Sequence, residues 1–241
     1  MKIEQQEAAK LNKFQKNLKT KFKDVSVLKQ SLIHKSYLNE VRNTDLSNNE
    51  RLEFLGDAVL ELVVTKYLFD FYPDRPEGEL TSFRAAIVRT ESIAKAAEEL
   101  EFGKYIYMSK GEEATGGRRR PYILANTFEA VIGAIYLDLG LEEAEKFIGR
   151  TLIPKITEIV EKRLDIDPKS KLQEIAQEVV KETPQYNLVS EEGPDHDKTF
   201  TVMVSLKETE LKSGKGRSKQ EAEQSAAKAT LKHWKELIKK F

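Results

Sequence analysis

The chain has 241 residues, 40 basic and 40 acidic side chains, 39% hydrophobic residues and no cysteine. This length suits one large domain or two ordinary ones, and the lack of cysteine excludes disulfides and thiolate metal sites. We expect no membrane anchor, because the first residues lack the apolar core of a signal peptide and no run approaches the roughly 18 apolar residues that span a bilayer. These features fit a cytoplasmic protein. Because the net charge is zero, any site for a polyanion must come from local clustering of charge.

The first hundred residues have the apolar spacing of an all-α unit. Helical patterns run up to Glu40, and His34 beside Tyr37 is interpreted as a packing residue. A long helix is predicted over residues 49–71 with Leu52, Leu55, Val59, Leu62 and Val63 on its apolar face. After a turn with two prolines and a glycine at 71–78, helices resume over about 80–100.

The helix at 49–71 carries Glu50, Glu53, Asp57 and Glu61 within an arc of roughly 80°. Acids at this spacing repel one another by a few tenths of a kcal/mol per pair. A solvated acidic face and a site for a positive partner explain the stripe about equally well. Gly56 favours the second reading, because a glycine inside a helix costs about 1 kcal/mol and indicates close approach of another element.

Residues 111–120 are predicted to form a flexible loop whose three successive arginines either meet phosphates or remain solvated. A strongly apolar helix follows at 122–138, and within it Glu129 needs a partner or a metal ion because an isolated buried carboxylate is costly. Asn126 shares its face, one helical turn earlier. A last helix is predicted over 141–164, with a kink at Pro154.

The pattern changes after residues 165–167, which we interpret as a linker between domains at 1–164 and 168–241. Asp167 is a plausible N-cap and Pro168 a first helical residue. A helix at 169–182 precedes strands at 186–191, 199–206 and 208–212, and Ser218 with Glu221 forms a capping box for a closing helix. The second unit is therefore predicted to be α-β-β-β-α.

Three stretches of sequence and this second unit resemble bacterial ribonuclease III over nearly the whole chain. The residues that carry the resemblance are Asn-Glu-Arg-Leu-Glu-Phe-Leu-Gly-Asp-Ala-Val-Leu at 49–60, Lys-Gly-Glu-Glu at 110–113 with Gly116 and Gly117, and Ile-Leu-Ala-Asn-Thr-Phe-Glu-Ala at 123–130. The resemblance implies an all-α endonuclease domain followed by an α+β double-stranded-RNA-binding domain.

The family resemblance also assigns roles to individual residues. It implies a homodimer with two acidic sites in one valley, each cutting one strand of an RNA duplex. Glu53, Asp57 and Glu129 match the catalytic, metal-binding carboxylates, and Glu50 and Glu77 match further acids of the valley. Phe54 matches an aromatic residue that packs into the partner subunit.

The chemistry of these residues agrees with that implication. Hydrolysis of a phosphodiester needs activated water and neutralisation of developing charge, and Mg²⁺ held by hard oxygen ligands provides both. Mn²⁺ is expected to substitute, and no organic cofactor is expected. One departure concerns Asn126, which stands where the family usually has Asp. Its amide oxygen can still ligate a hard cation but contributes no net charge.

In the second domain the resemblance places residues of the first helix and of the following loop in RNA minor grooves, where shape and 2′-hydroxyls are read. It places a basic group in contact with phosphates. Gln220 stands where a second lysine is common. One phosphate contact fewer predicts that the slope of log affinity for RNA against log salt concentration is smaller by about one unit. The minor-groove residues are Ser170, Gln173, Glu174 and His196, and the phosphate group is Lys215, Arg217 and Lys219.

The leading hypothesis is an Mg²⁺-dependent endoribonuclease that hydrolyses double-stranded RNA to products with 5′-phosphates, 3′-hydroxyls and short 3′ overhangs. Its expected substrates are structured precursors of ribosomal RNA and messenger RNA. The alternative is a double-stranded-RNA-binding protein that cleaves weakly or not at all because Asn126 replaces the usual Asp.

Overall fold

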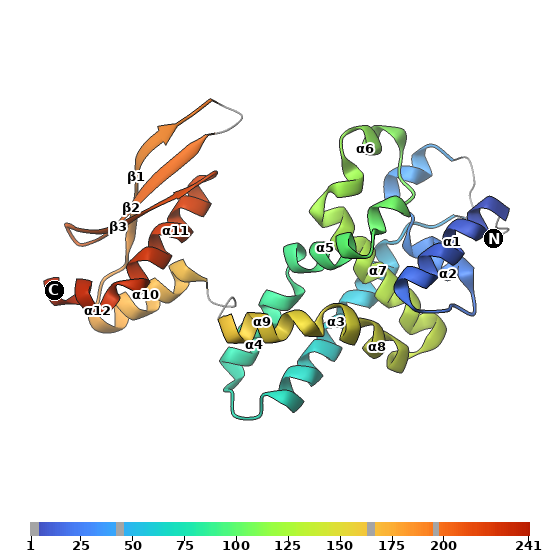
Figure 1. Ribbon diagram of the computed structural model, residues 1–241, viewed down its shortest axis with the longest axis horizontal. Coiled ribbons are helices and arrows are strands. Elements are labelled where there is room, and N and C mark those ends of the chain that lie inside the picture. Colours follow the sequence, from blue (N-terminus) through green and yellow to red (C-terminus); the bar gives the residue numbers. More distant parts are fainter. Residues whose placement is uncertain (1–4, 42–45, 163–166, 195–197) are drawn as a thin grey trace. The chain divides into compact units, whose positions relative to one another are not determined.

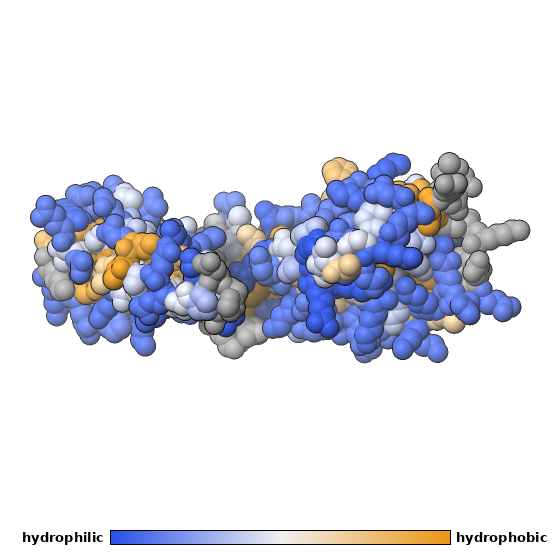
Figure 2. All heavy atoms as spheres, turned by 90° about the horizontal axis from the view of Figure 1, so that it is seen from above, coloured by the Kyte–Doolittle hydropathy of each residue, from blue (hydrophilic) through white to orange (hydrophobic). Residues whose placement is uncertain are grey.

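The computed structural model describes residues 5–41, 46–162, 167–194 and 198–241. The chain divides into two compact units, Met1–Asp165 and Ile166–Phe241, and each has its own hydrophobic core. In Figure 2 the visible face of the first unit is mostly hydrophilic, with hydrophobic residues in small separate areas.

The first unit is built from helices (Figure 1), which confirms the all-α prediction. Within its described residues the one β-type contact is an isolated parallel bridge between Ile33 and Tyr107. The α-helices are α1 Gln5–Leu18, α2 Val25–Ser31, α3 Glu50–Phe71, α4 Glu77–Val88, α5 Thr90–Glu99, α6 Lys110–Ala114, α7 Pro121–Leu139, α8 Leu141–Thr151 and α9 Ile153–Lys162. The 3-10 turns are η1 Lys35–Asn39, η2 Phe102–Lys104 and η3 Gly117–Arg119.

Helix α7 is the central element of this unit, because α2, α3, α5 and α8 all pack against it. It is long and apolar enough to cross a membrane by length and composition, which corrects the expectation that no such run exists. However, 61% of this stretch is buried inside the unit. Such burial is typical of a core helix that is apolar all round.

Helices α3 and α7 cross at two glycines. A Cβ atom on Gly56 would lie 1.8 Å from the carbonyl oxygen of Glu129, and one on Gly133 would lie 2.2 Å from the carbonyl oxygen of Leu52. The close approach that Gly56 predicted is therefore confirmed. The predicted apolar face of α3 is wrong at Leu62, which is 56% exposed.

Three predicted boundaries in the first unit are corrected. The helix expected at 141–164 is two helices, α8 and α9, with the break at Leu152; Pro154 lies in the first turn of α9, where its missing N–H costs nothing. The predicted residues 163 and 164 lie outside the described part. The segment at 80–100 begins earlier and breaks at Arg89, and part of the expected loop at 111–120 is helical in α6 and η3.

The second unit is an antiparallel sheet in the order β1-β2-β3 with helices packed against it (Figure 1), as predicted. Val204 and Leu206 of the middle strand are buried against Leu172 and Ala176 of the first helix and against Ala226 of the closing helix. The elements are α10 Pro168–Val179, β1 Gln185–Glu192, β2 Thr199–Leu206, β3 Thr209–Gly216, α11 Lys219–Lys232, α12 Trp234–Leu237 and the 3-10 turn η4 Ile238–Lys240.

Both predicted N-caps are confirmed, since Asp167 accepts a hydrogen bond from Ser170 N at 2.8 Å and Ser218 accepts one from Glu221 N at 3.1 Å. Helix α10 ends at Val179, earlier than predicted. Strand β3 runs four residues beyond its predicted end because Gly214 and Gly216 pair with β2 and let α11 approach. A Cβ atom on Gly214 would lie 2.1 Å from Ala226 N.

Candidate active site

The crossing of α3 and α7 brings the predicted carboxylates into electrostatic contact. Burial, followed by the charges of Asp57 and Glu53, raises the pKa of Glu129 to about 8. The ionised form is therefore unfavourable without a positive partner. Asp57 is exposed, whereas Glu53 and Glu129 are partly buried. The site thus combines a water-accessible acid with a poorly hydrated one.

Glu53 lies beside Asn126 of the second helix of the site, and both side chains line one cavity. Burial and the neighbouring Glu50 raise the pKa of Glu53, and the side-chain amide of Asn126 opposes this rise. The Asn126 amide therefore favours the ionised Glu53 carboxylate, and its oxygen is available as an additional acceptor.

The donor chemistry of this group fits a hard divalent cation, because three carboxylates and an amide oxygen come from two facing helices. Mg²⁺ commonly uses only one or two protein carboxylates and keeps several waters. In the present side-chain arrangement, however, no group of three or more His, Asp or Glu side chains among the described residues is gathered tightly enough to hold a metal ion.

The remaining acids of the predicted stripe and valley lie in different surroundings. Glu50 pairs with Lys35 at 3.4 Å, and Glu61 pairs with Arg84 Nε at 3.2 Å. Glu77 is the exposed first residue of α4. No hydrogen bond or ion pair in the described part of the chain joins Glu77 to Glu53, and the expected valley position of Glu77 remains a prediction.

The predicted RNA-binding residues of the second unit are at its surface where the structure describes them. Ser170, Gln173 and Glu174 are exposed on α10, and Glu174 pairs with Lys171 at 3.0 Å. His196 lies outside the described residues.

The basic group consists of the exposed residues Lys215, Arg217 and Lys219, at the end of β3 and the start of α11. Lys219 pairs with Glu191 at 3.3 Å. This partly exposed pair is weak in water and can be exchanged for a phosphate contact.

Two family models match the chain, one in each unit. Residues 24–156 match the model described as Ribonuclease-III-like, and residues 168–233 match the double-stranded RNA binding motif. The first match covers more than half of the chain. The chain belongs to the ribonuclease III family.

Individual ribonucleases are similar along almost the entire chain. Ribonuclease 3 of Pelotomaculum thermopropionicum is 48% identical over 222 residues, which cover 92% of this chain and 92% of that protein. Ribonuclease 3 of Geobacillus sp. strain WCH70 is 46% identical over 238 residues, with 99% and 96% covered. The predicted family and enzyme class are thereby confirmed: the chain is a ribonuclease III, a double-strand-specific endoribonuclease.

A solved structure agrees with the first unit. The nuclease domain of ribonuclease III from Campylobacter jejuni superposes with a TM-score of 0.55 at 44% identity, covering 59% of this chain and 95% of that one. That nuclease domain has a region involved in dimer formation.

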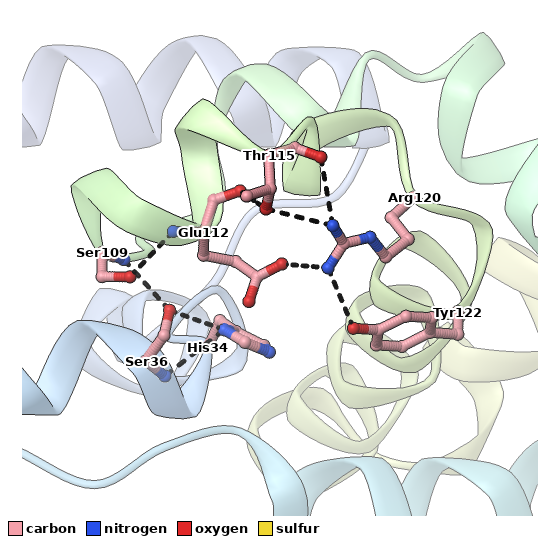
Figure 3. Close-up of polar contacts among 7 residues, drawn as sticks. All are labelled: His34, Ser36, Ser109, Glu112, Thr115, Arg120 and Tyr122. Atoms are coloured by element: carbon pink, nitrogen blue, oxygen red, sulfur yellow. Dashed lines mark hydrogen bonds and ion pairs between the residues drawn. The ribbon is translucent and has the colours of Figure 1, made fainter.

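The arginine-rich segment of this ribonuclease III corrects one prediction. Two of its three arginines serve the fold: Arg118 binds Glu113 through Nε at 2.6 Å and donates to the Gly103 and Ile106 carbonyl oxygens at 2.7 and 3.0 Å. Arg120 pairs with Glu112 (Figure 3) and donates to the Thr115 carbonyl oxygen at 3.1 Å. Only Arg119 is exposed among the three.

Sequence reasoning missed a group beside the acids. His34, Lys35 and Tyr122 line a cavity of about 60 Å³ together with Glu53 and Asn126. Burial lowers the pKa of His34, so its imidazole is neutral at pH 7. The interpretation of His34 as a packing residue is incomplete, because packing alone does not place an imidazole at the wall of the candidate site. No local pattern pointed there, since the backbone of His34 is held by a hydrogen bond to Tyr107, more than seventy positions away.

Proposed function

We propose that this ribonuclease III hydrolyses double-stranded RNA as an Mg²⁺-dependent homodimer and that Glu53, Asp57, Asn126 and Glu129 hold the metal ion. The observation that carries the proposal is the α3–α7 crossing, where burial and then the charges of Asp57 and Glu53 on α3 raise the pKa of Glu129 on α7 to about 8. A divalent cation relieves this repulsion and needs oxygen ligands of this kind. Mn²⁺ is expected to replace Mg²⁺.

The chain's own residues would divide the work at this site. Glu53 and Glu129 would bind the ion from the two helices, the exposed Asp57 would bind it from the solvent side, and the Asn126 amide would orient Glu53. Glu50 and Glu77 would line the valley. When bound, Mg²⁺ supplies activation of water near neutral pH and neutralises charge developing on the phosphate.

The proposed products carry 5′-phosphates and 3′-hydroxyls, with short 3′ overhangs. The overhangs arise when the two sites of a dimer cut opposite strands at positions a few base pairs apart.

The dimer is supported by apolar side chains exposed on α3. Phe54 is 81% exposed, and Leu62 and Phe69 are 56% and 72% exposed. Large exposed apolar residues gathered on one helix are typical of an interaction surface, and a second copy of the chain is the proposed occupant.

The second unit is proposed to hold the duplex through Ser170, Gln173, Glu174 and His196 in minor grooves and through a basic group on phosphates. Lys215, Arg217 and Lys219 form that group. Their exposure supports the proposal, because phosphate contacts need accessible cations. Structured precursors of ribosomal and messenger RNA in the cytoplasm are the proposed substrates.

A second candidate function is duplex binding with little or no cleavage. It is favoured by one observation: the Asn126 amide lies beside Glu53 and favours its ionised carboxylate, but it adds no negative charge of its own. An Asp at this position would instead add negative charge for the cation. Asn126 therefore decides between the two functions.

The test is cleavage of a labelled RNA duplex with and without Mg²⁺. The unmodified chain is compared with Asn126→Asp and Glu129→Gln, and duplex binding is measured in parallel. Cleavage that needs Mg²⁺ and is lost in Glu129→Gln supports the proposal. Duplex binding without cleavage, restored by Asn126→Asp, would establish the second candidate, and equal activity of the unmodified chain and Glu129→Gln would remove the proposed metal site.

A further inference from the structure

The backbone around His34 is held from a distant part of the chain. His34 N donates to the Tyr107 carbonyl oxygen at 2.9 Å, and Tyr107 N donates to the Leu32 carbonyl oxygen at 2.9 Å. These bonds form the parallel bridge between the segment before η1 and the segment before α6. The fold of the nuclease unit thus fixes the position of the His34 backbone from which the side chain extends.

The contacts of Ser36 assign a tautomer to the His34 ring. Ser36 N donates to Nδ1 at 3.3 Å, and Ser36 Oγ lies 2.8 Å from the same nitrogen and accepts from Ser109 N at 3.0 Å (Figure 3). Because a backbone N–H can only donate, Nδ1 is the acceptor and the proton of the neutral ring is on Nε2. The ring therefore presents an N–H donor, and no acceptor, on its far side from Ser36.

The Nε2 edge faces the region next to the candidate metal site. Figure 3 shows it directed away from Ser36, on the side where Tyr122 lies. His34 and Tyr122 line the same cavity of about 60 Å³ as Glu53 and Asn126, a space for about two water molecules. No hydrogen bond among the described residues uses Nε2.

The residues that line this cavity supply both negative charge and hydrogen-bond donors. Glu50 and Glu53 supply the charge, and the imidazole N–H and the Lys35 ammonium, which pairs with Glu50 at 3.4 Å, supply the donors. An RNA phosphodiester that enters an acidic site needs donors aimed at its non-bridging oxygens, because these oxygens would otherwise face carboxylates. A neutral N–H held in advance stabilises charge on such an oxygen without reorganisation.

We infer that His34 contacts the substrate, with its Nε2–H donating a hydrogen bond to a non-bridging oxygen of the phosphodiester that is cleaved. The inference rests on the proposed cleavage function and adds a residue to it. His34 transfers no proton in this role; it stabilises the negative charge that develops on the phosphate oxygen during cleavage. Ser36 and Ser109 act through His34 and are positioning residues.

The decisive variant is His34→Asn. Asparagine keeps a short side-chain acceptor for Ser36 N, as expected of an N-cap residue, but it has no group at the Nε2 position. His34→Gln restores a donor of longer reach. His233 of the second unit, whose Nδ1 lies 3.0 Å from the Ala229 carbonyl oxygen, provides the matched control His233→Asn.

The experiment measures single-turnover cleavage of a labelled duplex by saturating full-length enzyme in Mg²⁺, and duplex binding in Ca²⁺. We expect His34→Asn to slow cleavage by about tenfold to a hundredfold, the effect of losing one donor to a charged group. Duplex affinity and melting temperature should stay near those of the unmodified chain. His34→Gln should recover part of the rate, and His233→Asn should not change it.

A sulfur substitution separates direct contact from a structural role. Each non-bridging oxygen of the cleaved phosphodiester is replaced in turn by sulfur, a poor hydrogen-bond acceptor. At the contacted oxygen, sulfur should slow the unmodified enzyme by a larger factor than it slows the His34→Asn variant. The variant has already lost the hydrogen bond that the sulfur would remove. Fully additive effects at both oxygens would overturn the inference.

Two further outcomes also count against it. Cleavage by His34→Asn within twofold of the unmodified chain shows that the donor is not used, and a slower rate accompanied by equally weaker binding and lower melting temperature shows a structural role. If the unmodified chain does not cleave at all, the proposed function fails first and this inference fails with it.

Discussion

Gly56 and Glu129 meet at the crossing of α3 and α7 so closely that a Cβ atom on Gly56 would lie 1.8 Å from the Glu129 carbonyl oxygen. This contact forces the two helices that carry the acids to lie side by side along their backbones. A close packing contact thus determines the separation of Glu53 and Asp57 from Glu129.

Gly56→Ala should therefore destabilise the nuclease unit although alanine is the better helix former. We expect a loss of about 1–3 kcal/mol in the free energy of unfolding, because the backbones must separate, measured by denaturant unfolding. Gly149→Ala in α8 is the control: nothing lies within 4 Å of its added Cβ, and it should gain about 0.5–1 kcal/mol. Equal effects of the two changes would contradict the role of the crossing.

The raised pKa of Glu129 predicts how stability depends on pH. In the metal-free protein the folded state keeps this proton up to about pH 8, whereas an unfolded glutamate loses it near 4.5. The folded state therefore binds the proton more tightly, and its stability falls as the pH rises from 4.5 to 8.

Melting temperatures in EDTA should show this fall for the unmodified chain and a smaller one for Glu129→Gln. Adding Mg²⁺ at pH 7.5 should raise the melting temperature of the unmodified chain by preferential binding to the folded state, and Glu129→Gln should respond less. Glu98→Gln, which changes an exposed acid on α5, is the control. If the melting temperatures of all three proteins fell in parallel with rising pH, Glu129 would not be the cause of the fall.

Asn126→Asp should strengthen metal binding while weakening the metal-free fold. The change replaces a neutral amide beside Glu53 with a negative charge, which raises repulsion in EDTA and attraction for a cation. We expect the Mg²⁺ concentration for half-maximal cleavage to fall roughly tenfold. A titration of cleavage against Mg²⁺ measures this, and an unchanged midpoint would show that Asn126 already serves as well as Asp.

Salt dependence of duplex binding tests the basic group of the second unit. Lys215→Ala should lower the slope of log affinity against log salt by about one unit, and Gln220→Lys should raise it by about one. Binding is measured in Ca²⁺ with the full chain. Lys228 lies nine residues after Lys219, on the opposite side of α11 at about 100° per residue, so Lys228→Ala should leave the slope unchanged.

Phe54→Ala should weaken self-association without destabilising the isolated chain, because this side chain is 81% exposed. An aromatic anchor in an interface contributes about 2 kcal/mol or more, which corresponds to a dissociation constant about thirtyfold higher. Sedimentation at several concentrations measures it. Leu188→Ala, at an exposed residue of β1, is the control, and an unchanged constant for Phe54→Ala would exclude Phe54 from the dimer interface.

Several features of this protein follow from its sequence alone because they depend on neighbours along the chain. Helical spacing predicted α3 and α7, period-two alternation predicted β2, and Asp167 and Ser218 marked the starts of α10 and α11. The residue types of the acidic stripe and of Glu129 were sufficient to predict a cation site.

Other features needed contacts between segments that are distant in sequence. Only the packed structure shows that Arg118 and Arg120 bind within the nuclease unit, that Leu62 is exposed and that β3 continues through Gly214. The same holds for His34, whose place beside Glu53 and Asn126 depends on a bridge between Ile33 and Tyr107. Local patterns specify helices, strands and caps, whereas a site made from side chains of several elements exists only once their packing has set the distances between them.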